Sequence, residues 1–192
     1  MPTCAAVTAA DPARVRAALG RSKAGGYLYP GAAGGTALLF DPPKPRFGRI
    51  SRLRLLRPAL DLAFELKSPV WVVEDDGQCA GATACFADGD FRDLVWAADW
   101  TPPADPAARA ASRADWDAYC ARIAKKAGLS EPAALAEVRN DPAPDGGRAS
   151  GEEVLRRLCA VVGAPDTAVG QSLFCQAGPR GRDFVRFEAR RR

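Results

Sequence analysis

The chain contains no histidine, and this absence narrows its chemistry more than any other feature of its composition. A Ser-His-Asp triad, a Cys-His dyad and a histidine-bearing zinc site are all excluded within the chain. A base that works near neutral pH would have to be a carboxylate, a lysine or a thiolate with a strongly shifted pKa. We therefore expect a non-catalytic function ahead of an enzymatic one.

The six cysteines include no CxxC pair; they stand at positions 4, 79, 85, 120, 159 and 175. Cys79 and Cys85 share one face of an expected strand, but they lie roughly 20 Å apart along it. That separation excludes a disulfide within one unbroken strand. Scattered cysteines of this kind are typical of buried, reduced side chains. The sequence predicts neither a metal site nor a cofactor.

Long apolar runs are also missing, since none approaches the ~20 residues of a membrane span. The first residues lack the charged start and the leucine-rich core of a signal peptide. We therefore expect no membrane contact and a cytoplasmic location. The net charge of +4 is below what would by itself indicate nucleic-acid binding. A length of 192 residues and a hydrophobic content of 47% are sufficient for one domain with a core.

The stretch from Pro69 to Trp96 carries the most continuous apolar runs. Two Asp-Gly turns, at 75–77 and 88–89, divide it into three segments. Its first segment, VWVV, is β-branched and aromatic and is typical of a strand covered on both faces. These features predict a three-stranded meander over about residues 70–96. The middle segment, QCAGATACF, is so small on both faces that we expect a helix packed closely over it, and residues 60–66 are our choice.

The expected elements before the meander follow the order strand, helix, strand, strand, helix. Asp11-Pro12 predicts a helix start, because aspartate is a good N-cap and proline suits the first helical position. An apolar stripe through Leu56, Leu60 and Phe64 predicts a second helix, which either begins near Pro58 or is kinked there. This order predicts an α+β fold whose antiparallel or mixed sheet is built on the meander, with helices packed mainly on one face.

The composition changes after Trp100, where TPPADPAARAASRAD is interpreted as a Pro/Ala linker. Ser112 or Asp115 would then cap a helix over residues 116–127. We expect residues 1–192 to form a single α+β domain, with a helical elaboration over about residues 101–163 after this linker.

The last third of the chain contains one further helix signal and one hairpin signal. Ser150 and Glu153 form a capping box that predicts a helix over residues 151–162. The runs at 170–176 and 183–188 predict a final hairpin around GPRG.

The segment VEDDGQCAGATACFADGDFRDLVWA resembles a block of acidic turn, strand, Asp-Gly turn and strand in small cytosolic bacterial proteins. In those proteins helices follow, and then a segment similar to LRRLCAVVGAPDTAVGQSLF. Some proteins of this size and composition resemble immunity proteins that are encoded beside secreted toxins. The middle strand departs from the block, because alanines and cysteines replace its usual aromatic pair. The resemblance implies a fold and a masking role, and it assigns no functional residue.

Three groups of residues are candidates for a working surface. Carboxylates such as Glu74 and Asp76 flank the first turn, but those of the second turn belong to the opposite end of the middle strand, so a shared metal site is not expected. Aromatic residues are enriched at interfaces. An arginine-rich C-terminal part could attract phosphate. The binding residues that we predict are Glu74, Asp76, Trp96, Asp99, Trp100 and Trp116.

Three functions remain open from the sequence. The first is a protein-binding module, an immunity or adaptor protein that masks a partner protein. The second is a histidine-free enzyme acting on a small molecule or nucleotide, with Glu74 or Asp76 as its base; it requires a deep pocket and a perturbed carboxyl pKa. The third is nucleic-acid binding through the arginine-rich C-terminus.

Overall fold

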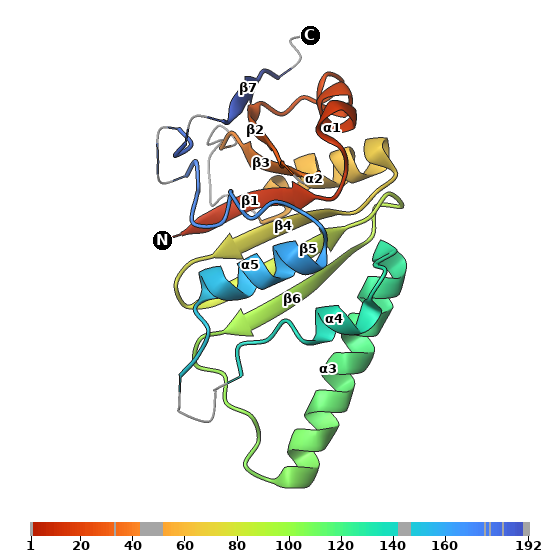
Figure 1. Cartoon of the computed structure of the whole chain (residues 1–192), viewed down its shortest axis with the longest axis vertical. Coiled ribbons are helices and arrows are strands. Elements are labelled where there is room, and N and C mark those ends of the chain that lie inside the picture. The colour runs from red at the N-terminus through yellow and green to blue at the C-terminus, as the bar shows by residue number, and fades with distance from the viewer. Residues whose placement is uncertain are drawn as a thin grey trace.

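Seven strands form one antiparallel sheet in the order β6-β5-β4-β1-β3-β2-β7 (Figure 1). The computed structural model describes residues 2–32, 34–42, 52–141, 147–174, 176, 178–181 and 183–189, without the side chains of 52–55. The elements in chain order are β1 (Thr3–Thr8), α1 (Pro12–Leu19), β2 (Gly26–Pro30), β3 (Thr36–Phe40), α2 (Arg52–Leu66), β4 (Val70–Asp75), β5 (Cys79–Cys85), β6 (Phe91–Ala97), α3 (Pro106–Ala127), α4 (Pro132–Ala136), α5 (Gly151–Val161) and β7 (Val185–Phe187). The predicted α+β class and the meander, as β4 to β6, are confirmed.

The first half of the chain forms a double split β-α-β unit. Its strands lie in the order β4-β1-β3-β2, and α1 and α2 connect strands that are not neighbours. Both helices pack on the same face of the sheet, where their apolar side chains meet those of β1, β3 and β4 in one buried cluster. α2 begins at Arg52, so Pro58 lies inside this helix and does not start it.

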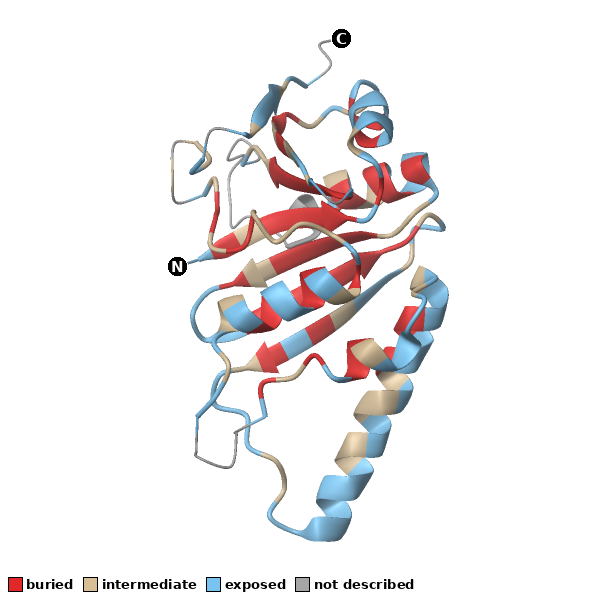
Figure 2. Cartoon of the chain, viewed as in Figure 1, coloured by how far each residue is buried: buried red, intermediate tan, exposed pale blue. Residues whose placement is uncertain are grey.

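The opposite face is covered by α3, α4 and α5 (Figure 1). α5 lies over β4 and β5, and the other two helices pack beside it. Three of the five helices thus share one face, and α1 with α2 cover the other. Both covers are needed because β1 and β4 direct apolar side chains to both faces, as a central strand does. Figure 2 shows these strands buried between the two layers.

The Pro/Ala segment after β6 is mostly helix, and its interpretation as a linker was wrong. α3 begins at Pro106, ten residues before the predicted start, and Asp105 caps it by accepting a hydrogen bond from the amide of Ala108 at 2.7 Å. The same Asp-Pro signal starts α1, where Asp11 accepts from the amide of Ala13 at 2.8 Å. Alanine and arginine are strong helix formers, so this segment needs no apolar stripe to be helical. Its first turns are exposed (Figure 2).

The middle strand of the meander is covered along one face, and toward one end only on the other. The face of Ala80, Ala82 and Ala84 packs under α5, whereas Cys85 at the end of the other face packs with α2. The predicted close cover by residues 60–66 is therefore only part of the arrangement. The main cover of this strand is α5, which begins 81 residues after Val70, the first residue of the meander.

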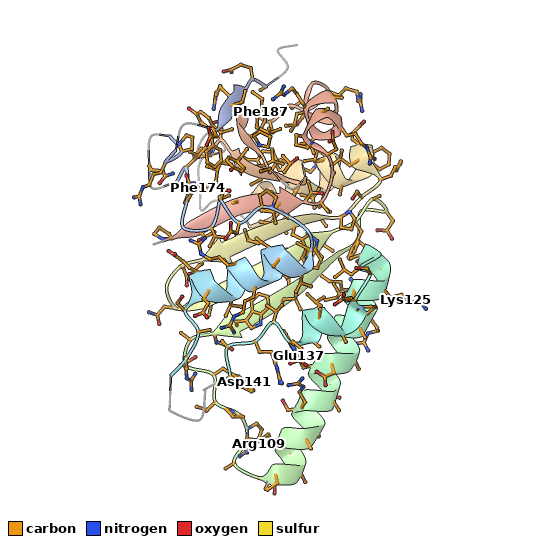
Figure 3. The ribbon with its side chains drawn as sticks, viewed as in Figure 1. Arg109, Lys125, Glu137, Asp141, Phe174 and Phe187 are labelled. Carbon is orange, nitrogen blue, oxygen red and sulfur yellow. The ribbon has the colours of Figure 1, made fainter. Side chains whose placement is uncertain are left out.

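The predicted C-terminal hairpin is absent from the part of the chain that the structure describes. β7 pairs with β2 at the edge of the sheet, and Ser172 forms an isolated bridge with Cys4 of β1. The ring of Phe187 packs edge-on against Phe40 with centroids 6.2 Å apart. Figure 3 shows Phe174 and Phe187 in this end of the molecule, far from the start of α3 near Arg109.

Candidate functional site

The two faces of β5 and β6 differ sharply in exposure. On the face toward α5, the side chains of Ala82, Ala84 and Leu94 are at most 1% exposed and Trp96 is 4% exposed. On the other face, Phe91 is 37% exposed and Val95 is 54% exposed. Because side chains alternate along a strand, the buried apolar side chains lie on one face and the exposed apolar side chains lie on the other. Large apolar side chains exposed on a regular sheet surface are a candidate binding surface.

We define the open face as the α2-side surface of β5 and β6, formed by Cys79, Gly81, Phe91, Asp93, Val95 and Ala97. The pairing places Cys79 opposite Ala97 and Gly81 opposite Val95. On this side of β5 the buried residues are Thr83 and Cys85, and among the described residues only Cys85 of the two strands joins the apolar cluster with α2. Figure 1 agrees, since α2 lies behind the β1–β4 half of the sheet.

The free edge of β6 is less accessible than its open face. The hydroxyl of Tyr119 donates to the carbonyl of Asp93 at 2.9 Å, and the amide of Asn140 donates to the carbonyl of Ala97 at 2.7 Å. Arg148 donates to the carbonyl of Ala98 at 2.9 Å. Side chains of α3 and of the segment after α4 therefore occupy backbone acceptors that an added strand would use. The edge of β6 is therefore partly closed to an added strand.

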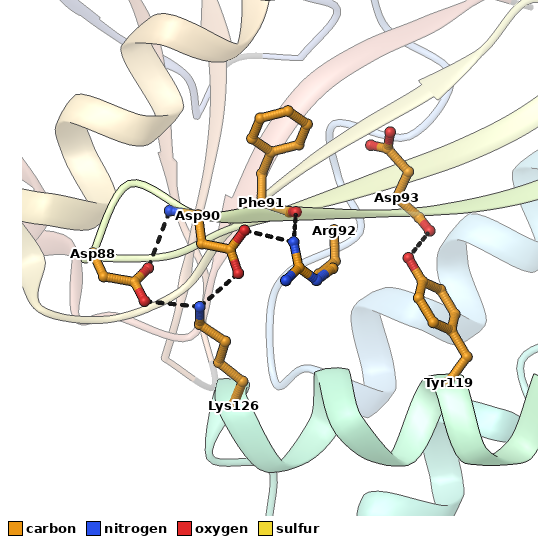
Figure 4. A network of polar contacts seen from close by, with 7 residues as sticks. All are labelled: Asp88, Asp90, Phe91, Arg92, Asp93, Tyr119 and Lys126. Atoms are coloured by element: carbon orange, nitrogen blue, oxygen red, sulfur yellow. Dashed lines mark hydrogen bonds and ion pairs between the residues drawn. The ribbon is translucent and has the colours of Figure 1, made fainter.

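A network of compensated charges lies at the β5–β6 turn, on the face toward α3 and opposite Phe91 (Figure 4). Lys126 of α3 contacts Asp88 at 2.8 Å and Asp90 at 2.6 Å, and Arg92 contacts Asp90 at 2.5 Å. The Lys126 ammonium also lies 4.7 Å from the centroid of the Phe86 ring. Its hydrogen bonds are the main reason that the pKa of both aspartates is lowered. This network links the β5–β6 turn to α3, and we assign it a structural role.

The end of the open face at Cys79 and Ala97 is acidic. Asp76 is exposed in the β4–β5 turn, where its carboxylate accepts hydrogen bonds from the amides of Cys79 and Gln78, both at 2.9 Å. These backbone hydrogen bonds lower its pKa, so the side chain stays ionised near neutral pH. Asp99, which is also exposed, follows the end of β6. Residues 70–99 hold seven Asp/Glu and one Arg, a net charge of −6 in a chain of +4.

The structure separates the binding residues predicted from sequence into two sets. Trp96 lies in the core, donating to the carbonyl of Val138 at 2.9 Å, and Trp116 is half-buried against it with ring centroids 6.2 Å apart. Both belong to the covered side. Trp100 is 40% exposed beyond β6. Glu74 pairs across the sheet with Gly81, so it lies on the α2 side beside the open face.

Sequence reasoning did not select Phe91, Val95 or Gly81. The signal was present in FRDLVWA, where Leu94 and Trp96 alternate with Asp93 and Val95. That alternation distinguishes two faces, but it does not say which of them a helix will cover. The exposed side became visible only when the positions of α2 and α5 were known.

The described residues also line two cavities, and neither contains Glu74 or Asp76. A cavity of about 890 Å³ lies between α1, α2 and the sheet, and its rim cations Arg21 and Arg57 pair with Glu65 and Asp61. A cavity of about 380 Å³ lies between the β4–β5 turn and the start of α5. Among the residues whose placement is described, no three Cys, Asp or Glu side chains gather closely enough to hold a metal ion.

The arginine-rich C-terminal part can be assessed only in part. Arg186 forms a two-point ion pair with Asp41, with distances of 2.6 and 2.8 Å. These hydrogen bonds raise the guanidinium pKa. Arg182, residues 190–192 and Cys175 lie outside the described residues. None of the helices described is both long and apolar enough to cross a membrane.

Comparison of the chain with protein-family models, with curated proteins and with solved structures gives no match.

Proposed function

We propose that this protein is a non-catalytic binding module that docks another protein on its open face, in an adaptor or masking role. The observation that carries the proposal is the exposure of Phe91 and Val95 on a regular sheet surface that the described side chains of α2 leave open. An aromatic and a branched side chain on a rigid strand lose little conformational entropy on binding, which makes them suitable anchors.

The size of the open face is consistent with the centre of an interface. Two seven-residue strands span roughly 24 Å by 10 Å. A stable protein interface buries about 800 Å² on each partner, with an apolar core and a polar rim. The open face therefore supplies the core, and the carboxylates around it supply part of the rim.

The enzymatic alternative finds little support in the geometry. A carboxylate base near neutral pH needs a raised pKa, whereas backbone hydrogen bonds lower the pKa of Asp76. Glu74 is half-buried beside the open face and lines neither cavity. The guanidinium of Arg186 is paired with Asp41, so this residue gives little support to nucleic-acid binding through the C-terminus.

Site-specific photo-crosslinking in cells of the source organism tests the proposal. A photoreactive phenylalanine analogue at Val95 is expected to give a discrete crosslinked product with one protein. The matched control carries the same analogue at Ala17, which is exposed on α1, and is expected to give none. If Val95 yields no product, or the same products as Ala17, the open face is not a protein-binding surface.

A further inference from the structure

A notch interrupts the open face at Gly81, midway along β5. Among the described residues, a Cβ atom added there would contact only the carbonyl oxygen of Leu94, at 3.6 Å, an ordinary van der Waals distance. The backbone of Gly81 is not in the left-handed region, so the turn chemistry of the chain does not require glycine at this position. A glycine within a strand often marks a place where another chain approaches the backbone closely.

Side chains on neighbouring positions surround the notch. Val95 faces Gly81 across β6 and Glu74 faces it across β4, while Cys79 and Thr83 flank it along β5. The far wall is rigid, because the Thr83 hydroxyl donates to the Asp93 carboxylate at 2.6 Å. The notch is thus flanked by the apolar Val95 on one side and the acidic Glu74 on the other.

The charges around the notch indicate which kind of partner it can bind. The strands and turns of residues 70–99 carry −6, and the exposed carboxylates of Asp76 and Asp99 lie at the notch end of the open face. Arg148 donates to the carbonyls of Ala98 and Trp100 on either side of Asp99, and the Lys126 network lies on the opposite face. The residues that define the open face include the acidic Asp93 and no cation, so this surface is complementary to a cationic partner.

We propose that the open face binds a basic segment of a partner protein, which places one aliphatic or aromatic side chain over Gly81 and directs lysine or arginine toward Asp76 and Asp99. This inference rests on the proposed function and specifies the chemistry of the partner. The apolar anchor buries the exposed surface of Val95, and the cations on the rim steer the encounter.

Selection from a displayed library of random dodecapeptides tests the inference on the full chain. Wild-type protein is expected to enrich peptides that carry an aliphatic or aromatic residue flanked by Lys or Arg. Gly81→Leu fills the notch and is expected to lower their recovery by about tenfold or more. The double substitution Asp76→Asn with Asp99→Asn is expected to lower it about threefold, because asparagine keeps the acceptor for the turn amides but loses the charge.

The matched control is Ala114→Leu, which adds the same side chain on the exposed surface of α3 and should leave recovery unchanged. Far-ultraviolet circular dichroism and a urea titration verify that every variant folds. Enrichment that is equal on Gly81→Leu, enrichment of acidic peptides, or no enrichment overturns the inference. So does a concentration-dependent dimer that Gly81→Leu abolishes, because the occupant would then be a second copy. If one of these outcomes is found together with a Val95 crosslink in cells, the proposed function is retained and the inference of a basic partner is rejected.

Discussion

The two faces of β5 and β6 are built from the same fourteen residues, yet one is dry and the other is open. On the α5 side, alanines leave room for Leu155 and Leu158 of the helix, and Leu94 and Trp96 close the layer. On the α2 side, Thr83 and Cys85 at one end of β5 are buried, whereas Cys79, Phe91 and Val95 are exposed. The difference shows that exposure is decided by where a covering helix ends, and not by the polarity of the strand alone.

The largest difference between the covered face and the open face of β6 is expected when Trp96 is truncated. Trp96→Ala removes a 4%-exposed side chain and its hydrogen bond to Val138, so the free energy of unfolding should fall by about 3–5 kcal/mol. Val95→Ala, on the adjacent residue but the open face, should change it by less than about 0.5 kcal/mol. Urea unfolding followed by tryptophan fluorescence or circular dichroism measures both. Similar losses in the two variants would mean that the open face is covered.

Thiol reactivity compares two positions on the same side of one strand. Cys79 is exposed, whereas Cys85 is fully buried and burial raises its pKa to about 12. At pH 8 a maleimide should modify Cys79 about a hundredfold faster than Cys85, because Cys85 must wait for a local or global opening. Peptide mass spectrometry at timed intervals separates the two sites, and unfolding in urea should remove the difference. Comparable rates in the folded protein would contradict the position of α2.

Added volume should affect the two sides in opposite directions. Ala82→Leu pushes a larger side chain into the packed layer under α5, where Ala82 is 1% exposed, and should cost about 1–3 kcal/mol. Gly81→Ala, on the adjacent residue, meets only ordinary contact distances and should be neutral or stabilise by about 0.4–1 kcal/mol through the unfolded chain. Urea titrations of the two variants beside the wild type measure both changes in the free energy of unfolding. A destabilised Gly81→Ala would show that the notch is occupied within the chain.

The smallest effect is expected in the charged network at the β5–β6 turn, on the face opposite Phe91 and Val95. Lys126→Met removes the contacts to Asp88 and Asp90 but keeps an apolar stem near Phe86. Because Lys126 lowers the folded pKa of both aspartates, their contribution is present above the unfolded pKa of 3.8 and is lost as pH falls below it. The wild type should therefore exceed Lys126→Met slightly in stability at pH 7, and the gap should shrink by pH 3. A gap that persists unchanged at pH 3 would assign the effect to packing.

Some of the fold could be predicted because its signals are short-range. Asp11, Ser150 and Gly128 act within a few residues, and the structure confirms a helix start at the first two and a helix end at the third. The two Asp-Gly turns give the meander its strands and place Asp76 and Asp88 at opposite ends of β5, as expected. The start of α3 was missed although Asp105-Pro106 repeats the Asp11-Pro12 signal, because the Pro/Ala composition of the segment was interpreted as a linker.

The sequence by itself determined where the chain turns, where most helices begin and end, and that β6 has two unlike faces, since these depend on backbone conformation, capping and side-chain alternation. Only the tertiary structure decided that Trp96 is core and Val95 is surface. That outcome depends on α5 and α2, whose positions follow from packing between residues far apart in the chain. The open face, and with it the proposed binding surface, is a property of that packing.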